Sequence, residues 1–161
     1  PMGRTARGVR GMNLGEGHQV IAMLVAPAEA AEGAEAAVVE PNGIAIPSSV
    51  LTATENGYGK RTVLADFRHS GRGTQGVKAI AISDRNGKVV AARLVNDEDE
   101  IMLITTGGVL IRTRVKEIRE LGRATQGVTL INLGEGEKLS GLEKVVETDD
   151  DADVGEEVAA E

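Results

Sequence analysis

Cysteine and tryptophan are absent from this sequence, and tyrosine and phenylalanine occur once each among its 161 residues. Without thiols there can be no disulfide framework, no cysteine-based zinc site and no cysteine nucleophile. One Tyr and one Phe cannot line a channel for single-stranded nucleic acid, which needs a series of stacking platforms. The sequence has no signal peptide and no long apolar run, so nothing in it points to secretion or a membrane. We therefore expect a cytoplasmic protein without a membrane partner.

Motifs for catalysis or cofactor binding are also missing. The sequence contains no Ser-His-Asp set, no paired-carboxylate cleft and no P-loop. The glycines of Gly71-x-Gly73-x-x-Gly76 formally match the dinucleotide-binding fingerprint. That fingerprint requires a helix after it, whereas a strand pattern follows here. We interpret these glycines as turn residues, and we expect no catalytic residue, no cofactor and no metal in this chain.

Three other features have ordinary interpretations. The acidic run 97–100 lacks the ligand spacing of a calcium loop, so it predicts a solvated turn at the start of a strand. His18 and His69 lie far apart without ligand partners at metal-site spacing, and we expect both at the surface. Tyr58 stands beside a tight-turn sequence, which favours a rim aromatic over a nucleophile.

The net charge of −7 is unevenly distributed. Residues 147–161 hold 8 acidic residues and no basic one, and residues 26–41 hold 4 acidic residues and no basic one. The remainder keeps 13 acidic and all 18 basic residues, a net charge of +5. The pattern predicts a basic body with an acidic Ala-rich loop and a disordered acidic tail, which permits a nucleic-acid partner.

The chain contains an internal repeat. Gly71-Arg72-Gly73-Thr74-Gln75-Gly76-Val77 recurs 51 residues later as Gly122-Arg123-Ala124-Thr125-Gln126-Gly127-Val128. A first copy, Gly3-Arg4-Thr5-Ala6-Arg7-Gly8-Val9, lies 68 residues before the second. The excess of 17 residues is about the length of the acidic Ala-rich stretch, which we interpret as a loop insertion. Repeats of about 50 residues are typical of solenoids and propellers.

Within each unit the pattern is that of β-strands. Residues 77–82 and 109–115 alternate apolar and polar side chains, and residues 101–105 form a short apolar run. Asn-Gly and Gly-Gly dipeptides at 56–57, 86–87 and 107–108 predict tight turns. About four antiparallel strands per unit predict an all-β chain built of β-propeller blades.

The number of units predicts part of a larger disc, or an open arc whose missing blades lie before Pro1. A closed propeller needs at least about four blades, and this chain supplies some three. The sequence also begins at Pro1 instead of an initiator Met, and a recognisable motif starts at once at Gly3, so we expect a piece of a longer protein. The expected organisation is a partial blade at 1–25, an acidic loop at 26–41, two blades at 42–146 and an acidic tail at 147–161.

Basic residues recur at the same register of the repeat. Arg61, Arg68 and Arg72 return one unit later as Arg112, Arg119 and Arg123, and Arg4 takes the same place as Arg72 in the first copy. In a radial repeat this places positive charge at one position on every blade, and such a belt can follow the phosphates of duplex DNA. The alternative is ordinary solvated surface. The candidate DNA-binding residues are Arg4, Arg7, Arg10, Lys60, Arg61, Arg68, Arg72, Lys78, Arg112, Arg114, Arg119 and Arg123.

Several motifs together resemble one known family. Residues 3–11, 56–62, 110–115 and 122–133 closely resemble the C-terminal domain of the A subunit of DNA gyrase, in the family's order. The resemblance implies a β-pinwheel, a six-bladed propeller variant whose neighbouring blades exchange strands. It also implies wrapping of double-stranded DNA without sequence specificity, in support of ATP-dependent negative supercoiling in the bacterial cytoplasm.

The same resemblance implies which functions lie elsewhere. The nucleophilic tyrosine would belong to the N-terminal part of the gyrase A protein, and ATP and Mg²⁺ would bind the gyrase B protein of an A2B2 complex. The family's Gln-Arg-Arg-Gly-Gly-type box is absent from this sequence. We expect it upstream of Pro1, and its absence from the complete protein would favour the related topoisomerase IV protein. A propeller that binds proteins through its acidic loop and tail is the alternative of another class.

Overall fold

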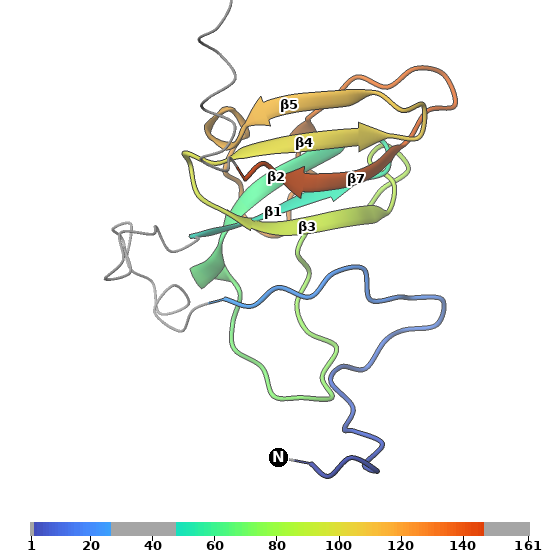
Figure 1. Ribbon diagram of the computed structural model, residues 1–161, viewed down its shortest axis with the longest axis vertical. Helices are drawn as coiled ribbons and strands as arrows, with labels where there is room; N and C mark the ends of the chain where they lie inside the picture. Colours follow the sequence, from blue (N-terminus) through green and yellow to red (C-terminus); the bar gives the residue numbers. More distant parts are fainter. Residues whose placement is uncertain (1, 27–47, 147–161) are drawn as a thin grey trace, which may run out of the picture.

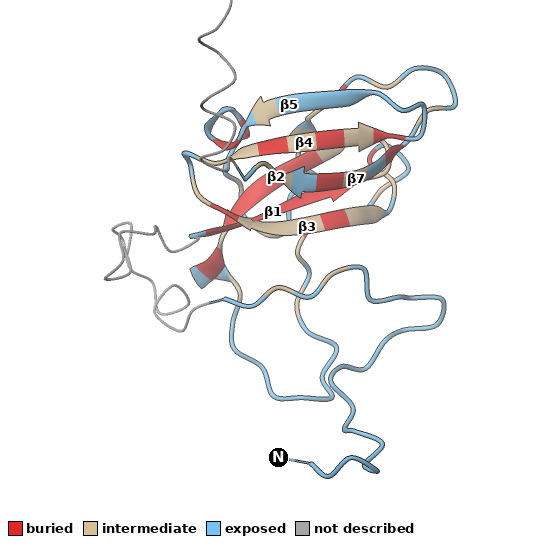
Figure 2. Cartoon of the chain, viewed as in Figure 1, coloured by how far each residue is buried: buried red, intermediate tan, exposed pale blue. Residues whose placement is uncertain are grey.

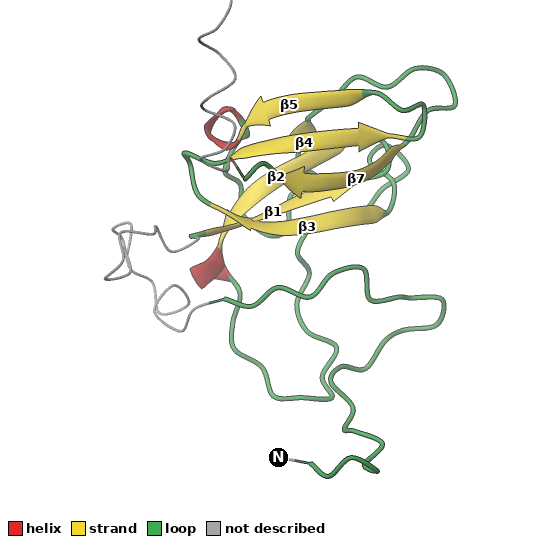
Figure 3. Cartoon of the chain, viewed as in Figure 1, coloured by secondary structure: helices red, strands yellow, loops and turns green. Residues whose placement is uncertain are grey.

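The computed structural model describes residues 2–26 and 48–146. These residues form β-structure with two short 3-10 turns and no α-helix (Figures 1 and 3). None of their helical turns could cross a lipid bilayer. The elements are β1 (Ser49–Thr54), β2 (Tyr58–Val63), η1 (Leu64–Asp66), β3 (Val89–Val95), β4 (Glu100–Thr105), β5 (Leu110–Arg114), η2 (Val115–Glu117), β6 (Val128–Thr129) and β7 (Leu139–Lys144). The all-β prediction is confirmed.

The strands form two antiparallel sheets. The first has the order β3-β1-β2-β6 and the second the order β5-β4-β7. Their central strands β1 and β4 begin 51 residues apart, which is the spacing of the sequence repeat. The hairpins β1-β2 and β4-β5 turn at Gly57 and Gly108, whose φ values of 82° and 81° suit glycine. Both turns were predicted from the sequence.

The first sheet takes its last strand from the following unit. β6 comes after β5 in the chain, yet it pairs with β2, where Thr129 lies opposite Tyr58 and Val128 opposite Gly59. A Cβ atom added to Gly127 would lie 2.6 Å from the carbonyl oxygen of Gly59, so this approach requires glycine. A Cβ at Gly59 would in turn collide with Leu130 and with the backbone of β1. The expected exchange of strands between neighbouring units is therefore present.

The core lies between the two sheets, where β3 packs against β7 (Figures 1 and 2). The alternating inward positions of β1 and β4 place Leu51, Ile101 and Leu103 there with no exposed surface. Each such side chain contributes roughly 1.5–3 kcal/mol of burial free energy. The other buried members of the cluster are Ala53, Ala91, Val95, Val115, Ile118, Ile131, Leu139 and Leu142.

One predicted strand is wrong. Residues 77–82 are not a strand, and Ile82 is exposed. The equivalent residues of the next unit, Val128 and Thr129, become a strand because the edge of β2 receives them. Among the described residues no comparable edge receives residues 77–78. The amide of Ala81 instead donates to the carbonyl oxygen of Thr125 at 2.9 Å.

The parts of the chain outside the two sheets are only partly described. Residues 2–26 run as an extended coil, whose one bridge in the described structure joins Met12 to Thr74. The predicted acidic loop lies outside the described residues except for Ala26, and the predicted acidic tail lies wholly outside them. The domain boundaries expected from the repeat stay predictions.

Candidate nucleic-acid interface

The three copies of the Gly-Arg motif fold into similar local turns. The first is closed by the amide of Ala6, which donates to the carbonyl oxygen of Gly3 at 3.0 Å. In the other two, the hydroxyls of Thr74 and Thr125 donate to the carbonyl oxygens of Gly71 and Gly122, at 3.1 and 2.9 Å. The last glycine of each copy has a positive φ, at Gly8, Gly76 and Gly127. The sequence recurrence is thus matched by recurrent turns, although Gly73 of the second copy has a positive φ and the equivalent residues Thr5 and Ala124 do not.

The three copies also lie in succession in space. The amide of Gly73 donates to the carbonyl oxygen of Gly11, and the amide of Asn13 donates to that of Thr74, both at 2.9 Å. These bonds hold the coil after the first copy against the second, below the sheets in Figure 1. Farther along, the guanidinium of Arg123 donates to the carbonyl oxygen of Lys78 at 3.4 Å. The second copy therefore touches the coil after the first copy, and Lys78, just after the second copy, touches the third.

Most candidate cations on or beside the three Gly-Arg turns, which together we call the row of Gly-Arg turns, are exposed. Seven of them take part in no ion pair among the described residues: Arg4, Arg7, Arg10, Arg68, Arg72, Lys78 and Arg119. Arg119 belongs to this set although Glu117 and Glu120 are its neighbours in sequence. Arg123 is half-buried and lines a shallow hollow with Lys78 and Asp66. These positions are open to a polyanion.

Two other candidates are engaged with a carboxylate. Arg112 forms an ion pair with Glu100 across the β4-β5 hairpin. Arg114 lies 3.6 Å from the other oxygen of the same carboxylate. Both arginines keep much of their side chains in solvent, so the pair is screened and weak. A DNA phosphate would nevertheless have to compete with Glu100 for either one.

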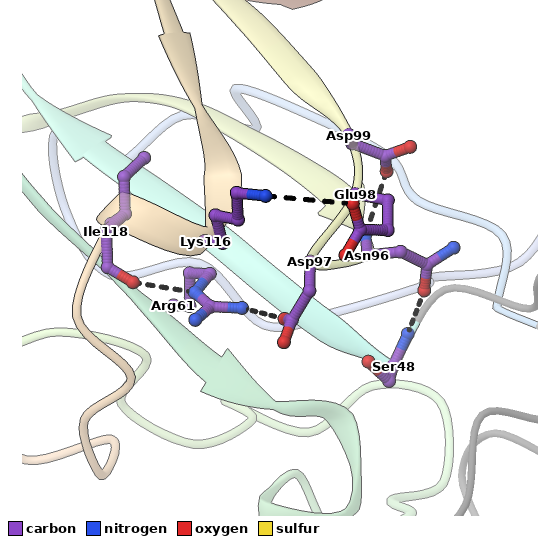
Figure 4. A network of polar contacts seen from close by, with 8 residues as sticks. All are labelled: Ser48, Arg61, Asn96, Asp97, Glu98, Asp99, Lys116 and Ile118. Atoms are coloured by element: carbon purple, nitrogen blue, oxygen red, sulfur yellow. Dashed lines mark hydrogen bonds and ion pairs between the residues drawn. The ribbon is translucent and has the colours of Figure 1, made fainter.

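The expectation that Arg61 faces outward is wrong. Its side chain is buried, its Nε donates to the carbonyl oxygen of Ile118 at 2.7 Å, and its Nη1 pairs with Asp97 (Figure 4). Asp97 belongs to the acidic turn between β3 and β4 that was expected to be merely solvated. It is mostly exposed but also serves as the counter-ion of Arg61.

Lys60, another candidate, has no exposed surface at all. Its ammonium donates to the carbonyl oxygens of Gly122 and Arg123, at 2.5 and 2.7 Å, and to the hydroxyl of Thr125 at 3.1 Å. Burial lowers the pKa of Lys60, nearby Arg123 lowers it further, and Asp66 opposes the change. Chain from the following unit covers both Lys60 and Arg61, so neither can reach a phosphate in this conformation.

Arg85 is a cation that the sequence did not single out. It lies over the ring of Tyr58 with its guanidinium carbon 4.7 Å from the ring centre. A hydrogen bond with Arg85 lowers the pKa of the Tyr58 hydroxyl. Tyr58 follows the Asn56-Gly57 turn, so its predicted place beside a turn is confirmed. The sequence signal that could have identified Arg85 was the turn dipeptide Asn86-Gly87, which directly follows it.

Competing site types find no support in the described part of the chain. No three His, Cys, Asp or Glu side chains gather there as a metal site. The glycines at 71–76 are not followed by the helix that a dinucleotide fingerprint requires. The exposed cations on the row of Gly-Arg turns remain the candidate site.

A protein-family model matches most of this chain. The model described as "DNA gyrase C-terminal domain, beta-propeller" matches residues 1–27, 48–96 and 99–145. Curated relatives include the DNA gyrase A subunits of Neisseria gonorrhoeae, 48% identical over 91% of this chain, and of Escherichia coli, 44% identical over 95%. The chain spans about 15% of the length of each of these relatives.

Two solved structures share the fold. A DNA gyrase A C-terminal domain superposes with a TM-score of 0.60 at 30% identity, covering 62% of this chain and 34% of that one. The C-terminal domain of a DNA topoisomerase IV gives a TM-score of 0.67 at 22% identity, covering 85% and 38%. The second likeness concerns the fold alone.

Proposed function

This chain belongs to the DNA gyrase C-terminal domain family, and we propose that it binds and wraps duplex DNA as the C-terminal part of a gyrase A protein. Binding would be through phosphates and without sequence specificity, because the available groups are Arg and Lys side chains on turns. Wrapping would support ATP-dependent negative supercoiling by the whole enzyme.

The row of Gly-Arg turns is the observation that carries this proposal. Hydrogen bonds join the second turn to the coil after the first turn, and the third turn to Lys78, which follows the second. Exposed cations recur at equal register, as Arg4 with Arg72 and Arg68 with Arg119. Duplex DNA bears about one charge per 1.7 Å of its axis, so a row of separated cations can follow it without reading bases. A row on the outside of successive units also supports a bend in the bound duplex.

The remaining parts of the proposal concern the complete protein. This chain would contribute no catalytic group, no metal and no ATP site. Cleavage would belong to the rest of the gyrase A protein, and ATP and Mg²⁺ to the gyrase B protein, in an A2B2 complex of the bacterial cytoplasm. The related topoisomerase IV protein is the second candidate, favoured by the fold likeness to its C-terminal domain. The identities of 42–48% to gyrase A proteins support the first candidate.

Two measurements test the proposed function. Fluorescence anisotropy with a mixed-sequence duplex should show binding that weakens steeply with salt and hardly depends on sequence. Ligation of a nicked plasmid in the presence of the complete gyrase A protein should trap a change in linking number, and the same protein without residues 1–146 should trap less. Equal linking-number changes would refute wrapping by this chain. Binding to proteins with no salt-dependent binding to DNA would instead favour the scaffold alternative.

A further inference from the structure

Lys60 is the most deeply buried charged side chain in the described structure, and the proposed DNA contacts do not use it. All its hydrogen bonds go to the third Gly-Arg turn, at Gly122, Arg123 and Thr125. An ammonium has three protons, and these three acceptors match them. Hydrogen bonds from a charged donor are stronger than neutral ones, so this contact is selective for a lysine.

The residues next to Lys60 hold the chain that leads into the same turn. The hydroxyl of Thr62 donates to the carbonyl oxygen of Leu121 at 2.8 Å. The backbone of Arg61 accepts from the amide of Leu121 at 2.9 Å and donates to the carbonyl oxygen of Arg119 at 3.2 Å. Three consecutive residues of β2 thus fix residues 119–125, which carry the exposed Arg119 and the half-buried Arg123.

The second sheet lacks this arrangement at the same register. The positions of Gly59 and Lys60 are occupied there by Leu110 and Ile111, both exposed on the edge strand β5. Leu110 places a bulky side chain where the first sheet needs close backbone approach, and Ile111 offers no donor. A lysine at this position is therefore found where the strand binds a turn of the following unit, as β2 does, and the strand itself does not require it.

We propose that Lys60 is a positioning residue for DNA binding, which fixes the Gly122–Gly127 turn so that Arg123 is presented to a phosphate. This proposal rests on the proposed function, because it assigns Arg123 a DNA contact. Lys60 itself touches no DNA. Its role is to couple the two units, since a side chain of one sheet fixes the position of a cation that belongs to the next unit.

The first test examines the turn without DNA. Lys60→Met keeps an unbranched side chain that is one atom shorter and removes its donors, and Lys88→Met replaces an exposed lysine as the matched control. Amide exchange at Leu121 and Thr125 should accelerate at least about tenfold in Lys60→Met and not in Lys88→Met, while Leu51 and Leu103 in the core keep their protection. Unchanged exchange at Leu121 and Thr125 would overturn the positioning role. Thr125→Val, which cuts the contact from the other side, should accelerate the same amides if Lys60→Met does not fold.

The second test is a double-mutant cycle in DNA binding. Arg123→Ala should weaken duplex binding several-fold in the native chain and less than about twofold in the Lys60→Met background, because the loosened turn no longer presents the guanidinium. Equal losses in both backgrounds would overturn the coupling, although DNA binding itself would stand. If the native chain binds no duplex, the proposed function fails, and the exchange experiment still decides whether Lys60 fixes the turn.

Discussion

Replacing Arg72 by Ala should lower the salt dependence of DNA binding by about one phosphate contact, whereas replacing Arg112 should not. Both changes remove one arginine at a position that the repeat predicts for DNA binding. Arg72 takes part in no ion pair among the described residues, but Arg112 is paired with Glu100. Because a phosphate must displace the Glu100 carboxylate from Arg112, the net free energy that this contact adds to DNA binding is smaller.

The size of the effect follows from counterion release. Each phosphate contact adds about 0.9 to the slope of log K against log salt, so a fourfold rise in salt weakens binding by about 3.5-fold per contact. The seven exposed and unpaired candidates, together with Arg123, would give a slope of at most about 7. All twelve candidates would give about 11.

The assay is anisotropy titration of a labelled duplex at several salt concentrations, with native chain, Arg72→Ala and Arg112→Ala in parallel. Circular dichroism checks that both variants keep their β-structure. A slope unchanged in Arg72→Ala but lower by about one in Arg112→Ala would refute the reasoning from ion pairing. A loss limited to one DNA sequence would mean base readout instead of phosphate contact.

Three further predictions concern stability and charge. Gly59→Ala should lower the free energy of unfolding by about 1–3 kcal/mol in urea denaturation, because its Cβ would collide with chain on both sides; Gly141→Ala, with open space at its Cβ, should change it by less than about 0.5 kcal/mol. Hydrogen bonds from the Thr105 hydroxyl and the Gly134 amide lower the pKa of Glu137. Its contribution is therefore present at neutral pH and lost as the pH falls below its ordinary value of about 4.5, and Glu137→Gln should flatten that acid loss in thermal melts. Truncation after Val146 removes eight carboxylates. If the tail competes with DNA phosphates, truncation tightens binding at low salt and the gain shrinks as salt rises; unchanged low-salt affinity would leave the tail without that role.

The features that could be predicted from the sequence were those determined by residues close together in the chain. The tight turns at Gly57 and Gly108 need only the positive φ of glycine, and the 51-residue repeat matches the spacing of the central strands. Recurrence of the Gly-Arg motif likewise predicted recurrent turns. The features that failed depend on a distant partner. Residues 77–82 alternate apolar and polar side chains like a strand, but a strand also needs the free edge of another strand to pair with. The sequence pattern of the segment does not show whether such an edge is present.

The different fates of Arg61 and Arg112 show what recurrence does and does not determine. They occupy equivalent places on β2 and β5, so the repeat correctly assigned them the same backbone position. Arg61 is buried because residues 118–131 of the following unit cover the outer edge of β2, and it then needs Asp97 and the carbonyl oxygen of Ile118 as partners. On β5 no described residues cover the edge, and Arg112 stays exposed. A cation at a fixed register is therefore a DNA-binding candidate only where the next unit leaves it uncovered. On the Gly-Arg turns, by contrast, Arg4 and Arg72 are exposed alike, while Arg123 is half-buried on a turn whose backbone is fixed by Lys60 of the unit before it.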